Sequence, residues 1–437
     1  MASPTVETDT LHKTYSEKGS EESAITSSES SKERVIPGGG SRAWTTLGGA
    51  WLAVAATFGY TYAFGIYQDL FTREHAASAM RVSWIGSTQL FLIIATGGPA
   101  GKLYDMGHFR FVVGAGSVLF TTALFMVSLA DPRKYYQIFL SQGIAMGIGG
   151  GMVYIPSLAV QAEHWPRRTL VMGIVSSGVP VGGTFFPIML NQLLRHGVSY
   201  EKSVRASAFV VLAMLFVANI LMSSSRRRST TKNQEATKMK ELFTDVPYMG
   251  IIIGGLLMDL GIFFPYFYLQ LYTILHGMDP NFAFYTLTIM NGAGFLGRII
   301  PNLLAEKYGA VNMLTASSTA CAILLWAFFG LKSVAAIVVF SLLYGFFAGA
   351  WISLLSPAVS NFSKNERDYG IRIGFASMLA SFTALTGTPI DGKLLGNTFP
   401  WDHAITFSAV RWSECFCSHY ELSADYRRRA RSLRCCS

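Results

Sequence analysis

Long apolar stretches follow one another along most of the 437-residue chain, with short polar segments between them. Many of these stretches are close in length to the ~20 residues that an α-helix needs to cross the hydrocarbon layer of a membrane, which is about 30 Å thick. Charged residues make up only 14% of the chain, whereas soluble domains contain about 25%. These features predict an all-α integral membrane protein and exclude a soluble globular domain.

Hydropathy and polar breaks predict about eleven membrane spans in two groups. The first group lies at residues 44–71, 82–104, 111–130, 136–162, 170–194 and 206–222. The second group lies at residues 248–275, 282–304, 311–330, 334–359 and 373–395. We therefore predict a disordered cytosolic tail at residues 1–41, a membrane half at 42–222, a cytosolic basic linker at 223–246, a second membrane half at 247–400 and an atypical basic tail at 401–437.

The last segment does not fit a symmetric arrangement of two six-helix halves. Residues 401–437 hold only short apolar pieces and then a basic run from Tyr426 to Arg431, and neither can cross a bilayer. We predict that the last helix of the second half is missing. We expect this end to be a truncated or altered version of a twelve-span ancestor.

Basic residues set the predicted orientation, because Lys and Arg near span ends stay on the cytoplasmic side. The linker between the halves carries Arg226, Arg227, Arg228, Lys232, Lys238 and Lys240. With this linker inside, the even number of spans before it places the N-terminal tail inside as well. We expect a multi-pass protein of the plasma membrane with a cytosolic N-terminus.

The formal net charge of +9 does not indicate nucleic-acid binding, because the basic residues fall in short segments between apolar stretches. The five cysteines show no paired metal-ligand spacing. No nucleophile with a base and no phosphate-binding loop occurs at a plausible spacing. We therefore expect no enzyme activity, no cofactor and no metal, and the lipid bilayer is the expected partner.

Four motifs carry a resemblance to a known family. They are the Pro-Gly-Gly-Gly stretch at residues 37–40 with the following Trp44, the loop at 101–110, the segment at 164–173, and residues 297–301 with 305–309. In order and placement they resemble the fungal monocarboxylate porter family of the major facilitator superfamily, from Pro37 to about Leu395. Gly38 and Glu306 stand where that family has Asp. The resemblance implies the major facilitator fold, with a substrate site near mid-membrane between two halves that move against each other.

Arg298 is the first candidate substrate-binding residue, because an Arg inside an apolar span is costly and must face a cavity, a partner or the interface. The resemblance implies that it binds the substrate carboxylate, which a guanidinium can meet with two hydrogen bonds. The alternative is that its side chain snorkels to the membrane surface. Tyr62, Asn291 and Tyr266 are expected to line the same cavity, and packing roles are the alternative for them. Tyr60, Tyr67, Gln89, Tyr154, Tyr268 and Gln270 are further candidates.

Asp259 is the candidate proton-coupling residue. Animal members of the family have an Asp one turn before the Arg that Arg298 resembles, and this chain has Gly294 there. Asp259 lies near the middle of the span at 248–275, where burial favours the neutral form of a carboxyl group. A structural Asp that bonds neighbouring helices is the alternative.

Charged residues at the cytosolic loops predict a conformational latch. Asp105 lies at a helix end close to Arg110, so it can accept bonds from exposed backbone N–H groups and pair with a basic residue. Arg167 and Arg168 are candidates for a second latch, with positive-inside retention as the alternative, and Glu306 is the matching acid of the second half.

Small residues and proline in the span at 170–194 predict a hinge. Gly178, Pro180, Gly182 and Gly183 lie close together there, and glycines four apart allow helix backbones to approach each other. A bending or sliding helix is one interpretation, and simple close packing is the other.

These observations predict a secondary transporter that moves a small organic acid or secondary metabolite by alternating access, with efflux ahead of uptake. Proton-coupled monocarboxylate uptake is one alternative. A truncated relic without transport activity is the other.

Overall fold

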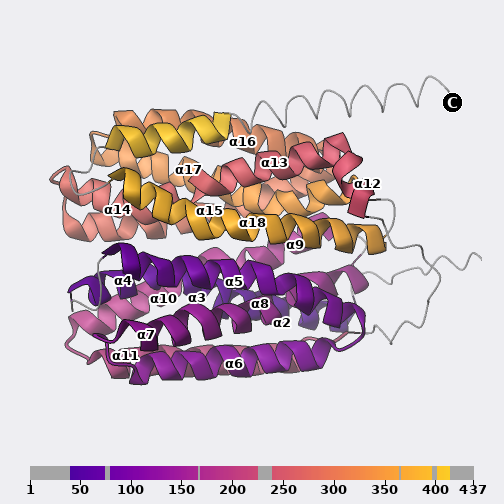
Figure 1. Ribbon diagram of the computed structural model, residues 1–437, viewed down its shortest axis with the longest axis horizontal. Coiled ribbons are helices and arrows are strands. Elements are labelled where there is room, and N and C mark those ends of the chain that lie inside the picture. The colour runs from indigo at the N-terminus through magenta and orange to yellow at the C-terminus, as the bar shows by residue number, and fades with distance from the viewer. Residues whose placement is uncertain are drawn as a thin grey trace, which may run out of the picture. The chain divides into compact units, whose positions relative to one another are not determined.

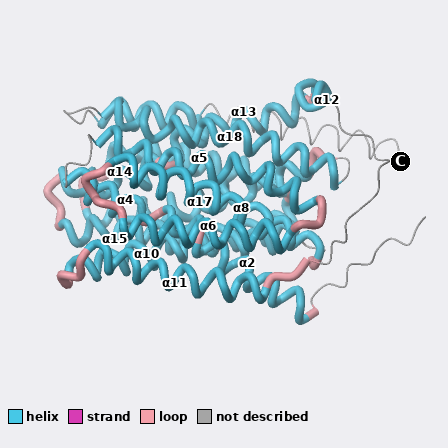
Figure 2. The backbone as a smooth tube through the Cα atoms, turned by 60° about the horizontal axis from the view of Figure 1, so that its bottom comes forward, coloured by secondary structure: helices cyan, strands magenta, loops and turns pink. Residues whose placement is uncertain are grey.

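The computed structural model describes residues 40–73, 79–165, 168–224, 239–363, 366–395 and 401–413. These residues belong to one compact unit, residues 39–437. Every regular element among them is helical and none is a strand, as Figures 1 and 2 show. The prediction of an all-α protein is confirmed.

Bent helices build the first part of the chain. The elements are α2 (Ser41–Ala56), α3 (Phe58–Thr61), α4 (Phe64–Arg73), α5 (Ala79–Asp105), α6 (Phe109–Leu129), α7 (Tyr135–Ile138), the π-helical turn η1 (Phe139–Ala145), α8 (Met146–Ala159), the 3-10 turn η2 (Val160–Glu163), α9 (Arg168–Ser176), α10 (Gly178–Arg195) and α11 (Tyr200–Leu221). The predicted first, fourth and fifth spans are therefore each interrupted by a break or a turn.

The second part repeats the pattern with longer helices. The elements are α12 (Met239–Thr244), α13 (Val246–Ile262), α14 (Phe264–Leu275), α15 (Pro280–Tyr308), α16 (Ala310–Ala327), the 3-10 turn η3 (Phe328–Gly330), α17 (Val334–Ser360) and α18 (Glu366–Leu395). The short helix α12 lies in the predicted linker, whose residues 225–238 fall outside the described residues.

Eight helical stretches in the described part of the chain are long and apolar enough to cross a membrane. They are Phe109–Leu129, Tyr135–Glu163, Thr169–Arg195, Tyr200–Leu221, Val246–Leu275, Ala310–Gly330, Val334–Val359 and Arg372–Leu395. This confirms a multi-pass membrane protein, and the total of about eleven spans stays a prediction.

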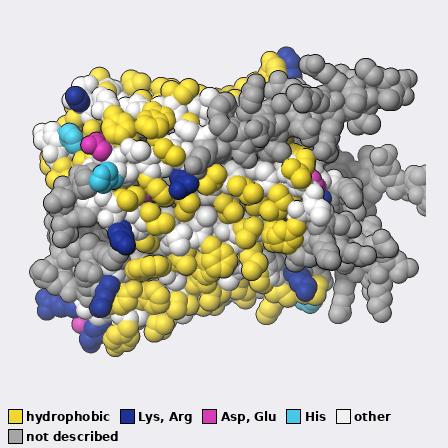
Figure 3. All heavy atoms as spheres, turned by 45° about the horizontal axis from the view of Figure 1, so that its top comes forward, with side chains coloured by type: hydrophobic (Ala, Val, Ile, Leu, Met, Phe, Trp, Pro, Cys, Tyr) yellow, Lys and Arg dark blue, Asp and Glu magenta, His cyan; other side chains and the backbone are white. Residues whose placement is uncertain are grey.

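Apolar side chains face outward along these helices, as in the view of Figure 3. Phe111, Val118 and Leu129 of α6 are 69%, 67% and 69% exposed, and Phe216 of α11 is 65% exposed. Such a surface would be unfavourable in water, so it fits contact with lipid.

Two separate hydrophobic cores hold the helices together. One contains buried residues from Leu47 to Met222, and the other contains buried residues from Leu242 to Trp412. Tyr62 packs against both cores. The helices that contain the cores meet where α5 packs against α18 and where α9–α10 pack against α15, with α9 also touching α17. Figure 1 shows these contacts between the purple and orange parts.

A helix over residues 401–413 follows α18 and corrects the prediction for this region. We predicted that residues 401–437 form a tail outside the helical halves. Instead Ala404, Ile405, Ala409 and Trp412 are buried in the second core. Thirteen residues rise about 20 Å, which is short of the hydrocarbon thickness, so the missing last span stays a prediction. Residues 414–437 lie outside the described residues.

Candidate substrate site

The break between α9 and α10 at Ser177 is where this site begins. Pro187 lies inside α10 and Pro180 lies in its first turn, and proline has no backbone N–H to donate to the carbonyl four residues earlier. The Ser176 and Gly183 carbonyls therefore lack their usual helical partners. A buried carbonyl left unsatisfied costs about 1–3 kcal/mol, so these groups need donors from elsewhere.

Helix α15 supplies both donors. Arg298 Nη1 donates to the Ser176 carbonyl at 2.7 Å, and Asn291 Nδ2 donates to the Gly183 carbonyl at 3.2 Å. Both side chains are buried, with exposed fractions of 3% and 2%. Arg298 thus points from the second core toward the first, which does not fit the snorkelling alternative.

Three tyrosines surround the Arg298 guanidinium. The Tyr62 side chain is within hydrogen-bonding reach of it, and Tyr154 and Tyr266 are close enough to interact with its charge. The Tyr62 and Tyr266 rings meet edge to face with centroids 5.9 Å apart. Tyr62 also lies beside Gly183, next to Asn291. The structure thus brings together the four predicted substrate-binding residues, Arg298, Tyr62, Asn291 and Tyr266.

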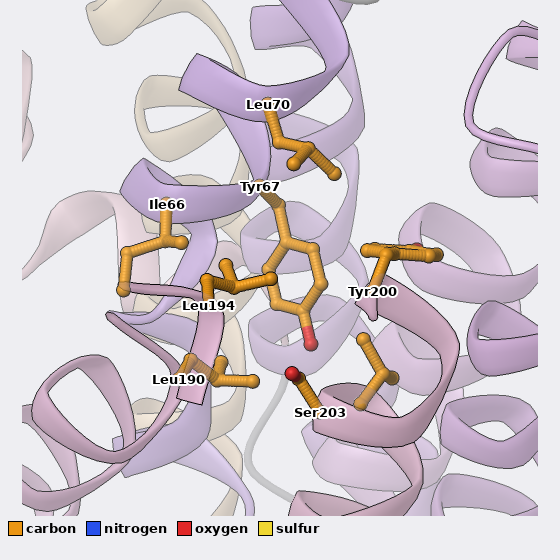
Figure 4. A pocket seen from close by; sticks show the side chains of 8 residues that line it. Ile66, Tyr67, Leu70, Leu190, Leu194, Tyr200 and Ser203 are labelled. Carbon is orange, nitrogen blue, oxygen red and sulfur yellow. The ribbon is translucent and has the colours of Figure 1, made fainter. Parts of the chain in front are cut away.

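Other predicted lining residues have packing roles. Tyr60 bonds Tyr67 at 2.5 Å and Ser207 at 2.9 Å within the first core, and Gln89 is fully buried. A small apolar cavity of about 10 Å³ adjoins Tyr67, and its lining residues are Ile66, Tyr67, Leu70, Leu190, Leu194, Tyr200, Ser203 and Val204. Figure 4 shows the Tyr67 and Ser203 hydroxyls pointing toward each other in it. This volume holds about one water, which is too small for an organic substrate.

Asp259 faces a different helix from Arg298. It lies in α13, near the middle of the stretch Val246–Leu275, and its carboxyl is within hydrogen-bonding reach of Thr383 in α18. Its side chain is only partly buried. Thr383 thus places one neutral hydroxyl beside the Asp259 carboxyl.

Asp391 in α18 is a buried acid that our sequence reasoning missed. It is 1% exposed, and its Oδ1 has no hydrogen-bond partner among the described residues. Tyr268 and Tyr344 are close enough to interact with it electrostatically. The signal was an acid within the apolar span at 373–395, the same signal that singled out Asp259.

The predicted latch residues lie at helix ends. Asp105 ends α5 and Arg110 lies in the first turn of α6, and both are exposed. The turn between them contains Gly107, whose φ of 85° favours glycine. Glu306 is exposed near the end of α15. Arg167 lies outside the described residues, and only the backbone of Arg168 is described.

One hydrogen-bonded acid and one ion pair at helix ends were also missed. Glu163 accepts from the Tyr104 hydroxyl and, at 3.0 Å, from the Ser224 hydroxyl, so it joins the ends of three predicted spans. Arg372 Nη1 bonds Asp245 Oδ2 at 2.8 Å, and Arg372 is 3% exposed. Neither pairing can be read from the sequence, since the partners lie 61 and 127 residues apart.

The predicted hinge residues lie against α2 and α3. A Cβ on Gly178 would come within 2.6 Å of the Trp51 carbonyl, and one on Gly182 would clash with the Ala55 carbonyl. These glycines permit close packing within the first half. Gly183 and Pro180 instead contribute to the contact with α15. Among the described residues, no group of three or more His, Cys, Asp or Glu could hold a metal ion.

Comparison with known proteins gives the family. The family model described as Major Facilitator Superfamily matches residues 49–388. The aspyridones efflux protein apdF of Emericella nidulans is 35% identical over 397 residues, 90% of this chain and 80% of that protein. The agnestins efflux protein AgnL12 of Paecilomyces divaricatus is 35% identical over 358 residues, 81% of each chain.

A third relative, the MFS transporter asaE of Aspergillus flavus, is 32% identical over 380 residues, 86% of this chain and 85% of that protein. These names describe efflux and transport, and they do not single out the monocarboxylate porter branch. The residues matched by the family model, 49–388, include Tyr62, Tyr266, Asn291 and Arg298. The chain belongs to the Major Facilitator Superfamily and is a transporter, not an enzyme.

Proposed function

We propose that this protein exports an organic acid or an acidic secondary metabolite by alternating access, from the cytosol across the plasma membrane, with its N-terminus in the cytosol. The efflux proteins among its relatives support the direction. The observation that carries the proposal is the buried Arg298 at the contact between the two cores, surrounded by Tyr62, Tyr154 and Tyr266.

The chemistry of this cluster fits an acid with an apolar body. A guanidinium presents a planar set of donors that a carboxylate or enolate can meet with two hydrogen bonds. The tyrosine rings offer apolar faces for the rest of the molecule, and their hydroxyls offer further polar contacts. Movement of one half against the other would then expose the bound acid to each side in turn.

Charged groups at the helix ends have a proposed role in closing one face. Asp105, Arg110, Arg167, Arg168 and Glu306 would form contacts that break when the halves separate there. Gly178, Pro180, Gly182 and Gly183 would let α9 bend against α10 at Ser177. Asp259 would exchange a proton during the cycle, because it is a partly accessible carboxyl in mid-span.

Proton-coupled uptake of a monocarboxylate is the second candidate function. The Arg298 donor fork favours it equally, because a carboxylate binds the same way in either direction. The direction of net movement therefore decides between the two.

The test is the ratio of intracellular to external organic acids in source cells with and without the gene, at two external pH values. Export predicts that an acid accumulates inside the deletion strain and that the wild-type gene reverses this. Loss of pH-dependent uptake of an external acid would favour the second function. An unchanged ratio for all acids would overturn both and favour a non-transporting protein.

A further inference from the structure

The two carbonyls that accept bonds from α15 are related by sequence spacing. Ser176 and Gly183 are seven residues apart, as are Pro180 and Pro187, and as are the donors Asn291 and Arg298. Seven residues are about two helical turns, so the two prolines lie on one face of α10 and the two donors lie on one face of α15. The pairs run in opposite order along the two helices, so the contact is repeated in register.

Each half supplies one side of both bonds. The acceptors are backbone carbonyls of α9 and α10 that proline has deprived of their helical N–H partners. The donors are the Arg298 and Asn291 side chains of α15, and burying such polar groups inside an apolar span is costly unless they have partners. The contact continues toward one end, where Gly173 approaches the Arg298 carbonyl, and toward the other, where Arg195 Nη1 donates to Asn281 Oδ1 at 2.8 Å.

The guanidinium keeps unused donor capacity in this arrangement. Arg298 Nε is buried without a hydrogen-bond partner among the described residues. A carboxylate would accept from two guanidinium N–H groups and would add charge, whereas the Ser176 carbonyl is a neutral acceptor. An anionic substrate is therefore the better partner for the same donor.

We propose that the Ser176 and Gly183 carbonyls occupy the Arg298 and Asn291 donors when no substrate is bound, and that an acid with a second acceptor about 10 Å away replaces them. The inference rests on the proposed function, since it names the substrate chemistry of the same site. Because the replaced acceptors belong to one half and the donors to the other, binding releases the contact between the halves. In this exchange each donor keeps a partner, and the two released carbonyls are hydrated where the halves separate.

Substitutions on the acceptor side and on the donor side distinguish exchangeable hydrogen bonds between the halves from simple packing of the helices. Pro180→Ala restores an N–H that returns the Ser176 carbonyl to the helix, so Arg298 loses its competitor but keeps its capacity for an anion. Arg298→Gln removes the charge and the forked guanidinium donors, and leaves a shorter neutral amide. Pro156→Ala is the matched control, because Pro156 is also a buried proline inside a first-half helix, α8.

The experiment measures distances between spin labels in the purified full-length chain, in a background without the five native cysteines. In one sample the labels replace Met106 and Tyr308, which are 43% and 55% exposed. In a second sample they replace Lys134 and Lys332, which are exposed on the loops after α6 and α16. The probes are benzoate, an aromatic carboxylate, and benzamide, its neutral analogue; benzoate has no second acceptor, so it tests the Arg298 bond alone.

We expect benzoate but not benzamide to change the distances in the wild type. Without any probe, Pro180→Ala should change the ratio of the two sets of label distances about twofold. It should also bind benzoate about fivefold more tightly, which is the equivalent of one hydrogen bond. Arg298→Gln should shift the populations and lose the benzoate response, and Pro156→Ala should match the wild type.

The inference is overturned if Pro180→Ala and Pro156→Ala give the same distances and the same benzoate affinity. If Pro180→Ala does not fold, the two variants Pro187→Ala and Asn291→Ala provide the same comparison at the second bond. Identical label distances in these two variants and in the wild type would then overturn the inference. The gene-deletion test is independent. If the label distances do not change but deletion of the gene stops export of an acid, this inference alone is overturned. If the label distances change but the deletion leaves the metabolite ratio unchanged, the proposed function alone is overturned.

Discussion

Buried charged residues of the second half differ in whether a partner compensates them. Arg372 is paired with Asp245 at 2.8 Å and also lies 4.7 Å from the Tyr248 ring centroid. Asp391 is buried, and its Oδ1 has no hydrogen-bond partner among the residues that the structure describes. Replacing Asp by Asn acts differently on an ion pair and on a buried carboxyl without a cation, because only the first replacement leaves a charge behind.

We predict opposite stability changes for the two Asp→Asn substitutions. Asp245→Asn leaves the Arg372 charge buried and should destabilise the protein by about 3 kcal/mol. Asp391→Asn removes a buried carboxyl that has no partner for one oxygen and should leave the stability unchanged or higher. Thermal unfolding in one detergent compares them, and a larger loss for Asp391→Asn would contradict this account.

Single residues were predictable where their cost is visible in the sequence. Arg298 and Asp259 stood out because charged groups inside apolar spans need a reason to be there. The acceptor of the Arg298 bond could not be foreseen, because it is a backbone carbonyl 122 residues away. Asp391 carried the same signal as Asp259 and was overlooked.

Helix α15 packs against α17 through glycines that let the backbones approach each other. A Cβ on Gly297 would clash with the Phe346 carbonyl, and one on Gly345 would clash with the Met290 carbonyl. Backbone atoms cannot rotate aside as a flexible side chain can. This crossing holds Arg298, the neighbour of Gly297 in sequence, at a fixed distance from α17.

We predict that Gly297→Ala destabilises the protein by about 1–3 kcal/mol, because the added methyl pushes two backbones apart. Gly292→Ala is the control on the same helix, since a Cβ there meets nothing within 4 Å, and alanine favours a helix by up to about 1 kcal/mol over glycine. Thermal unfolding should rank Gly297→Ala below and Gly292→Ala at or above the wild type. Equal melting temperatures would argue against the close crossing.

Hydropathy located the helices because the membrane demands long apolar stretches. It did not locate the breaks at Ser177 and Phe263, where a span divides into two helices without a change in polarity. Hydropathy also did not show that the helix at 401–413 is part of the second core. The burial of this helix depends on contacts such as that of Trp412 with Trp351, and not on the length of an apolar stretch.

At the scale of the whole molecule, transport requires the two halves to move while each core stays intact. The second contact between them, α5 with α18, includes Phe91 and Phe382, whose ring centroids are 5.5 Å apart. Phe125 and Phe209 are 5.1 Å apart within the first half. These pairs distinguish motion between halves from motion within one.

We predict that a short cross-link between cysteines replacing Phe91 and Phe382 lowers transport to about a tenth or less, because it ties the halves together. The same reagent between cysteines replacing Phe125 and Phe209 should leave most of the transport. The measurement is the initial efflux rate before and after cross-linking, with reversal by reduction of a cleavable reagent. Equal inhibition by both links would speak against movement of the halves.

The central claim is that the Arg298 cluster between the halves binds the transported acid. The most direct test restores the deletion strain with the wild type, Arg298→Lys or the partly exposed control Arg205→Lys at matched membrane levels, and measures the efflux rate of the accumulated acid. Lysine keeps the charge but loses the planar donor fork, so Arg298→Lys should export at least about tenfold more slowly, with Arg205→Lys unchanged. Full export by Arg298→Lys would contradict the account.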